Sequence, residues 1–231
     1  MNTERKTKTL SFQQETIFVD CFNTIILRKE KKNRVFKNWD KALEAEYQIK
    51  WQRFYRSYKR INFWLCLKKI FKKFILQENF DLVLKKMYEN LFKGRTEKVE
   101  DFITVAKNLY IEEEQKIHFV NNHFIDFLRE QKKLGKKIYI VSDFYCSANE
   151  IQIWLRNLKI NDIFAAVYSS SDFGKEKSTT GLYKVLLKKL DMTPKDVMMI
   201  GDNLWSDYLM AKSCGLSAKI INNKKELKNE N

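Results

Sequence analysis

The stretch that most constrains this chain is an apolar run that ends in a single carboxylate: Ile17-Phe18-Val19-Asp20-Cys21-Phe22-Asn23-Thr24-Ile25-Ile26. The apolar residues predict a buried β-strand over 16–20, and a short polar turn separates it from the apolar residues that resume at Ile25. Open α/β sheets bind their ligands outside the carboxyl ends of their strands. The stretch therefore predicts an α/β fold in which Asp20 lies at the edge that binds a ligand.

Four more strands are expected in the second half of the chain, at 137–141, 163–168, 197–200 and 217–221. The helices expected around them lie at 112–134, 147–158, 179–190 and 206–214. Strands that alternate with helices of this length predict βαβ units. We therefore expect a Rossmann-like, doubly wound parallel sheet.

A long segment without β pattern interrupts this alternation between about 35 and 110. Its aromatic and aliphatic residues recur at helical spacing, and Gly94 marks a break between helices. The expected organisation is a core formed by 1–30 and 116–222, a helical insertion at 31–115 and a frayed tail at 223–231. Within the insertion, 61–76 reads as a basic amphipathic helix, which either packs on neighbouring helices, the favoured interpretation, or contacts a membrane or a partner.

The chain carries a formal net charge of +15, and the residues from Arg28 to Lys73 hold sixteen Lys or Arg against four Asp or Glu, a local charge of +12. Such a patch suits nucleic acid, an anionic membrane surface or a phosphorylated substrate, or it is only a solvated basic face. Nucleic-acid binding is the less favoured interpretation. No apolar run reaches the length of about 18 to 20 residues that a membrane span needs, so none is expected.

Cysteine usage and the N-terminus bear on the compartment. Cys21, Cys66, Cys146 and Cys214 are scattered without a C-x-x-C pair, and the first residues are too polar for a signal peptide. These features are typical of a reduced, cytoplasmic protein.

Polar residues follow several of the expected strands. Ser142-Asp143, the loop around Lys177, and Gly201-Asp202-Asn203 followed by Asp207 all fall at or just after strand ends. Each group alone fits ordinary turn chemistry. Because the carboxyl ends of parallel strands share one edge, we expect them to converge on Asp20. A carboxylate that attacks phosphate needs a divalent cation, and Mg²⁺ prefers oxygen ligands such as these.

These residues, in this order, resemble the four motifs of the haloacid dehalogenase superfamily, whose members are mostly phosphatases. The matching residues are Asp20 to Thr24, Ser142, Lys177, and Gly201-Asp202-Asn203 with Ser206-Asp207. The third motif is a lysine with an aromatic or aliphatic residue six places later. Lys177 with Tyr183 fits it, whereas Lys175 would be followed by Gly181. The insertion between the first two motifs resembles the superfamily's α-helical, C1-type cap.

The resemblance implies a role for each matching residue. Asp20 would be the nucleophile that forms an aspartyl-phosphate, and Thr24 would hydrogen-bond it or the transferred phosphate. Mg²⁺ would be held by Asp20, Asp202, Asp207 and the Phe22 backbone carbonyl. The phosphate-binding residues would be Ser142, Asp143, Lys177 and Asn203. The implied activity is Mg²⁺-dependent hydrolysis of a small phosphorylated metabolite, such as a sugar phosphate.

A narrower resemblance is to a bacterial branch found with glycosyltransferase and surface-polysaccharide genes. It rests on Asp20 to Ile25 and on Ser142-Asp143-Phe144-Tyr145. The segments 42–46 and 112–114 also resemble the cap and cap-exit helix of that branch.

Phe22 departs from the superfamily pattern, because most of its phosphatases carry there an aspartate that serves as general acid and base. A positioned acid–base contributes about 10²- to 10⁴-fold to a rate, and phenylalanine cannot transfer a proton. The leaving group would then depart unaided, or the cap would supply the acid, with Glu44, Glu46 or Glu112 as candidates. Alternatively the chain is a weak or silent binding module that is accessory to surface-polysaccharide biosynthesis.

Overall fold

The computed structural model of the chain describes residues 13–29, 32–48, 53–61, 80–92 and 98–222. The expected amphipathic helix at 61–76, the break at Gly94, Cys66 and the polar tail lie wholly or almost wholly outside these residues. Among the described residues, no helix is long and apolar enough to cross a membrane.

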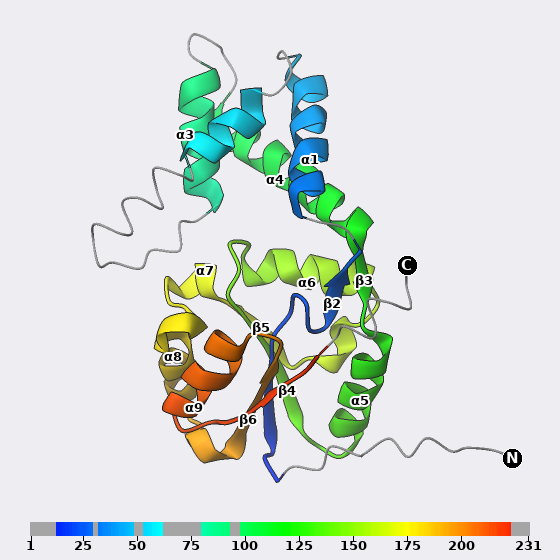
Figure 1. Cartoon of the computed structure of the whole chain (residues 1–231), viewed down its shortest axis with the longest axis vertical. Coiled ribbons are helices and arrows are strands. Elements are labelled where there is room, and N and C mark those ends of the chain that lie inside the picture. The colour runs from blue at the N-terminus through cyan, green and yellow to red at the C-terminus, as the bar shows by residue number, and fades with distance from the viewer. Residues whose placement is uncertain (1–12, 30–31, 49–52, 62–79, 93–97, 223–231) are drawn as a thin grey trace, which may run out of the picture.

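Five parallel strands form the central sheet, in the order β5-β4-β1-β6-β7 (Figure 1). The strands are β1 (Thr16–Val19), β4 (Lys137–Ser142), β5 (Ala166–Ser169), β6 (Val197–Gly201) and β7 (Ser217–Ile220). All five correspond to strands expected from the sequence. The predicted Rossmann-like parallel sheet is therefore confirmed.

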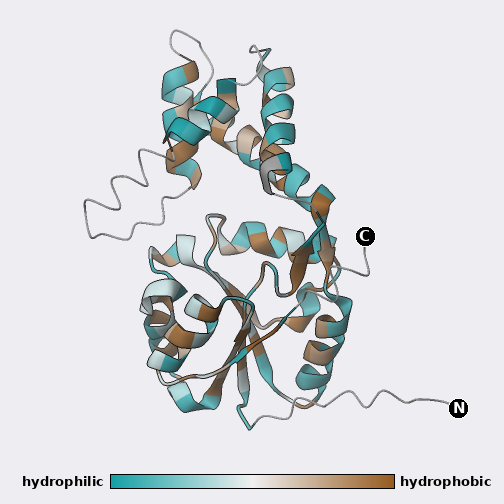
Figure 2. Ribbon diagram, in the orientation of Figure 1, coloured by the Kyte–Doolittle hydropathy of each residue, from teal (hydrophilic) through white to brown (hydrophobic). Residues whose placement is uncertain are grey.

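Alternating side chains of β1 pack into two different apolar layers. Ile17 and Val19 join a buried cluster with residues of α5 (Asn122–Lys133) and α6 (Ala148–Asn157). Phe18 faces the other way, into a cluster with residues of α8 (Gly181–Lys189) and α9 (Met210–Ser213). Figure 2 shows the apolar strands between helices whose outer faces are polar. This period-two burial fixes the register of β1, because a slip by one residue would exchange the two faces.

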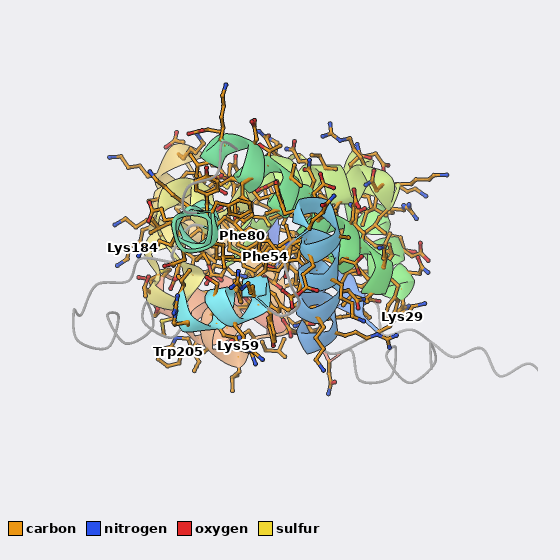
Figure 3. The ribbon with its side chains drawn as sticks, turned by 90° about the horizontal axis from the view of Figure 1, so that it is seen from above. Lys29, Phe54, Lys59, Phe80, Lys184 and Trp205 are labelled. Carbon is orange, nitrogen blue, oxygen red and sulfur yellow. The ribbon has the colours of Figure 1, made fainter. Side chains whose placement is uncertain are left out.

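The insertion is helical, as expected, with α1 (Lys32–Tyr47), a helix across 53–61, α3 (Phe80–Leu91) and α4 (Val99–Ile117). Its own buried cluster includes Trp39, whose indole Nε1 donates to the Ala106 carbonyl at 2.7 Å. Figure 3, viewed from above, shows Phe54 and Phe80 in the interior and Lys59 at the outer edge. The domain boundaries at 31 and 115 stay a prediction.

The expected single helix over 112–134 is wrong. The structure ends α4 at Ile117, forms β3 (His118–Val120), and begins α5 at Asn122, with the Asn121 side chain accepting from the Phe124 amide. β3 pairs antiparallel with β2 (Ile26–Arg28), which follows the Asp20 turn. Helical periodicity in the sequence concealed the interruption because the partner strand is remote along the chain.

A buried polar network lies where this two-stranded ribbon joins α4. The Glu114 carboxylate is fully buried and accepts from Arg28 Nη2 at 3.1 Å and from the Tyr110 hydroxyl. Tyr145, in the loop after β4, hydrogen-bonds the Tyr110 hydroxyl. The network thus ties the insertion to the sheet, with the charge of Glu114 matched by Arg28.

His118 belongs to this network in its neutral form. Its Nε2 lies 3.3 Å from a Glu114 oxygen, but the same nitrogen also accepts from Arg28 Nε at 3.3 Å. Burial, followed by the Arg28 charge, lowers the pKa of His118 to about 3. We therefore interpret the contact with Glu114 as proximity and not as an ion pair.

This neutral histidine predicts a loss of stability on acidification. Between about pH 6.5 and pH 3, His118 is protonated in the unfolded chain but stays neutral in the folded protein. The free energy of unfolding should therefore fall by up to about 1.4 kcal/mol per pH unit in this window. Urea unfolding of His118→Gln should show a shallower pH dependence, while His123→Gln, at an exposed position, keeps the wild-type slope. Equal slopes for all three proteins would contradict the assignment.

Candidate functional site

Three strand ends meet at the centre of the sheet. Asp20 follows β1, Ser142 ends β4 and Gly201 ends β6, and β1 lies between the other two strands. The Asp20 amide donates to the Ile200 carbonyl at 2.9 Å, which continues the pairing of β1 with β6 past the end of β1. Helices of the insertion stand above this edge in Figure 1. The sheet therefore places Asp20 between Ser142 and Asp202.

Lys177 bridges the carboxylates of Asp20 and Asp207 at this edge of the sheet. Its Nζ donates to Asp20 Oδ1 at 2.6 Å and to Asp207 Oδ1 at 2.7 Å, and the side chain is 1% exposed. Lys175, two residues earlier, is exposed. The structure thus brings Lys177, and not Lys175, against Asp20.

Asp143 holds the loop that carries this lysine. Its two carboxylate oxygens accept from the backbone amides of Lys177, at 2.7 Å, and of Ser178, at 3.1 Å. The Ser178 carbonyl in turn accepts from Trp205 Nε1 at 3.1 Å. This anchoring role was not foreseen from the sequence, because nothing there connects a carboxylate after β4 with amides of the Lys177 loop. The predicted contact of Asp143 with phosphate stays a prediction.

Asp207 lies on a helix that differs from the expected one. In place of an α-helix over 206–214, the structure has a π-helix, η4 (Leu204–Leu209), followed by α9. The Asn203 side chain caps η4 by accepting from the amides of Trp205 and Ser206. The Asn203 amide donates to Asp207 Oδ2 at 3.0 Å. The helix start and the carboxylate therefore hold each other in place.

Tyr183 reinforces this arrangement from α8. Its hydroxyl donates to the Ser206 carbonyl at 2.9 Å, and Ser206 Oγ donates to Asp207 Oδ1 at 3.1 Å. The tyrosine that follows Lys177 by six residues thus supports the helix that carries Asp207.

Because Gly201 has no side chain, the Asp207 side chain can lie directly against its backbone. A Cβ at this position would lie 2.2 Å from Asp207 Oδ2 and 2.8 Å from its Cβ, closer than real Cβ contacts. The glycine is required by this close approach and not by its backbone angles.

Gly201→Ala is accordingly expected to displace Asp207 and to lower kcat/KM by about 10²-fold, the scale of a 1 Å misplacement in a site. The measurement is steady-state hydrolysis with a phosphorylated substrate, together with a Mg²⁺ titration. Gly181→Ala is the matched control, because its Cβ would meet the flexible Lys175 side chain at 3.3 Å. Wild-type kinetics and Mg²⁺ response in Gly201→Ala would show that Asp207 is not needed in this position.

Thr24 contacts Asp20 through a tight turn. Asn23 has a left-handed backbone with φ of 58°, and the amides of Ile25 and Ile26 both donate to the Cys21 carbonyl. The turn brings Thr24 Oγ1 to 3.3 Å from Asp20 Oδ2. Asp20 is therefore held on one oxygen by Thr24 and on the other by Lys177.

Burial dominates the electrostatics of the site. It raises the pKa of Asp20 to about 7, against the opposing effect of Lys177 and with a further increase from Asp207. Burial also raises the pKa values of Asp202 and Asp143. For the Lys177 ammonium, burial lowers the pKa, but Asp20 and Asp207 outweigh it and the net pKa is well above its ordinary value. Lys177 is therefore a fixed positive charge.

The carboxylates fit a divalent cation. One oxygen each from Asp20, Asp202 and Asp207 lie within 4.8 Å of one another. Three carboxylates and the single Lys177 ammonium leave a formal charge of −2 in a largely buried space. All the donors are oxygens, which Mg²⁺ prefers, and a dication would balance this charge.

Phe22 lies in an aromatic cluster beside the site. Its ring stacks on Phe144 with centroids 4.1 Å apart and meets Trp154 edge-on at 5.1 Å. The His118 ring lies 5.7 Å away. The position that would carry the usual acid–base is thus part of an apolar wall.

The remaining predicted residues lie at different places. Ser142 is buried at the end of β4. Among the glutamates proposed as alternative acids, Glu46 on α1 and Glu112 on α4 are exposed, and Glu44 is half-buried on α1. The assignment of any of them as an acid stays a prediction.

Known proteins share this architecture. A family model described as haloacid dehalogenase-like hydrolase matches residues 14–215. Glyceraldehyde 3-phosphate phosphatases of Pyrococcus abyssi and Pyrococcus furiosus are 30% and 32% identical over 87 residues. Each alignment covers 37% of this chain and 35% of the relative, so only about a third of either curated relative is matched.

Solved structures resemble the fold over nearly the whole chain. The HAD-hydrolase YfnB of Bacillus subtilis, a magnesium-bound structure, is 17% identical with a TM-score of 0.60 and coverage of 93% of this chain and 91% of that one. A 2-haloacid dehalogenase of Pseudomonas syringae is 13% identical with a TM-score of 0.64, covering 91% and 87%. At these identities the likeness shows the fold alone.

Proposed function

We propose that this chain, which belongs to the haloacid dehalogenase-like hydrolase family, is a Mg²⁺-dependent phosphohydrolase of a small phosphorylated metabolite. The observation that carries the proposal is the buried bridge from Lys177 Nζ to Asp20 and Asp207, next to Asp202. A fixed cation and an oxygen-lined dication site are what a carboxylate needs to approach an anionic phosphoryl group. The partial sequence identity to two glyceraldehyde 3-phosphate phosphatases supports a small phosphorylated metabolite as the substrate.

In this proposal the Asp20 carboxylate attacks phosphorus, and the bond from phosphorus to the leaving oxygen breaks, leaving an aspartyl-phosphate. Water then attacks that phosphorus and releases inorganic phosphate and free Asp20. Lys177 and Ser142 bind the phosphoryl oxygens, and Thr24 orients Asp20. Mg²⁺, when held by Asp20, Asp202, Asp207 and the Phe22 carbonyl, would offset the negative charge of nucleophile and phosphate.

Because Phe22 cannot act as a general acid, the range of leaving groups that the substrate can carry is restricted. The leaving oxygen takes its proton from solvent or from the insertion, or it departs as a stable anion. A good leaving group, such as the oxygen of an acyl phosphate or a sugar 1-phosphate, is therefore favoured over a plain alkyl phosphate. Hydrolysis of a panel spanning these leaving groups, with and without Mg²⁺, tests the proposal. Absence of turnover on every substrate would overturn it.

A second candidate is a silent binding module, and the aromatic packing of Phe22 favours it, because an apolar wall stands where proton transfer usually occurs. The sequence resemblance to the surface-polysaccharide branch suggests an accessory role in that biosynthesis. Mg²⁺ binding without hydrolysis anywhere in the panel would favour this candidate.

A further inference from the structure

A second charged site lies on the insertion, away from the strand ends. A cavity of about 760 Å³ opens between α1 and the helix across 53–61, and its lining residues are Arg34, Lys37, Asn38, Asp40, Lys41, Tyr55, Arg56 and Lys59. All of them belong to these two helices, and none is a carboxylate, serine or lysine of the Asp20 site. A volume of this size is typical of small-molecule sites.

The lining is strongly basic. Five Lys or Arg side chains face one carboxylate, which gives the cavity wall a formal charge of +4. That carboxylate, Asp40, is only 3% exposed and accepts from the Tyr55 amide at 2.8 Å. It therefore fastens the second helix to α1, while the cations remain at the cavity.

The cations repeat along one face of α1. Arg34, Lys37 and Lys41 are spaced three and four residues apart, and like charges at this spacing destabilise a helix by about 0.2–0.5 kcal/mol per pair. Within the residues that the structure describes, the side chains of Lys37 and Lys41 form no hydrogen bond or ion pair. An anion in the cavity would relieve this repulsion.

Tyr55 lines the cavity, but its ring already contacts other side chains, and this favours a ligand that is recognised by its charge. Lys59 Nζ lies over the Tyr55 ring at 4.4 Å from its centroid, and Phe36 stacks on the same residue at 6.2 Å. Sites for single-stranded nucleic acid combine basic grooves with aromatic platforms for the bases. Here Lys59 and Phe36 already contact the Tyr55 ring, so the cavity offers positive charge but no free aromatic ring on which a base could stack.

We propose that this cavity binds a small polyphosphate anion, with Lys37 and Lys41 as its principal contacts. A short chain of linked phosphates matches both the formal charge of +4 and the volume of the cavity more closely than a single phosphate does. The site is independent of phosphatase turnover, since none of its residues takes part in the proposed reaction.

Isothermal titration with tripolyphosphate in metal-free buffer tests the proposal without requiring catalysis. Lys37→Gln/Lys41→Gln should weaken binding at least about 10-fold, equivalent to 1.4 kcal/mol. The matched control is Lys184→Gln/Lys188→Gln, which removes two exposed lysines at the same spacing from α8 of the core and should bind as wild type does. Asp20→Asn should bind tripolyphosphate with wild-type affinity.

Four results would overturn the proposal. These are unchanged affinity in Lys37→Gln/Lys41→Gln, equal weakening in both double variants, an affinity changed in either direction in Asp20→Asn, and tighter binding of a short single-stranded DNA at the same lysines. The third would place the anion at the Asp20 site, and the last would assign the surface to nucleic acid. Thermal unfolding of both double variants checks that these exposed substitutions leave the fold intact.

Discussion

Asp20→Asn is expected to abolish Mg²⁺-dependent phosphate release, lowering kcat/KM by at least about 10³-fold, as removal of a catalytic nucleophile does in other enzymes. An amide of the same size cannot form the aspartyl-phosphate and is a poor ligand for a dication. Its one oxygen can still accept from Lys177, and its NH2 group can donate to the Thr24 hydroxyl, so the local packing is preserved. The measurement is phosphate release on the best substrate of the panel, with thermal unfolding as the test of folding.

Asp196→Asn is the matched control for this variant. Asp196 is an exposed aspartate in η3 (Pro194–Asp196), directly before β6 and therefore at the opposite edge of the sheet. It should retain wild-type kinetics. Hydrolysis by Asp20→Asn at the wild-type rate would remove Asp20 from the reaction and with it the proposed mechanism.

Lys177→Met is expected to produce the largest loss of stability. Lys177 and Asp207 are each 1% exposed, so the substitution leaves two carboxylates buried without their shared cation. Removing one partner of a buried ion pair typically costs about 3–5 kcal/mol. The defect should shrink as the pH falls below about 7, because Asp20, whose pKa is about 7 with the lysine present, is then neutral in the folded protein.

Urea unfolding in metal-free buffer at several pH values measures this defect. Lys175→Met, at an exposed position on the same loop, should change the free energy of unfolding by no more than about 0.5 kcal/mol. Added Mg²⁺ should restore part of the stability of Lys177→Met, since a dication can take over the neutralisation of the carboxylates. A pH-independent defect, or equal effects of both substitutions, would contradict the central role of this lysine.

The strands of the core were predictable because their signals are local. Apolar β1 ends at a carboxylate, and each later strand is bounded by turn residues or by glycines such as Gly135 and Gly215. The order of the motifs then predicts which strand ends converge, since parallel strands share an edge. The structure places Asp20, Lys177 and Asp207 in contact, as that argument expects.

What could not be predicted depends on partners that are remote in sequence. His118 to Val120 form a strand only because Ile26 to Arg28 pair with them, and their helical neighbours concealed this. The π-helix after Asn203 depends on the Asn203 cap and on Tyr183, which comes from another helix. The cavity of the insertion requires two helices to be positioned against each other. Periodicity within one helix carries no such information.

The register of β1 has a consequence for synthesis of the chain on the ribosome. Thr16 pairs with Lys137 on one side and with Val197 on the other, so β1 has no strand partner until those segments have been made. The helices of the insertion can pack against one another earlier, because the buried residues of their apolar cluster all lie between Val35 and Ile117. During translation β1 therefore stays exposed and unpaired until residues 137–140 have been made. We expect nascent-chain chaperones to bind this apolar segment during that interval.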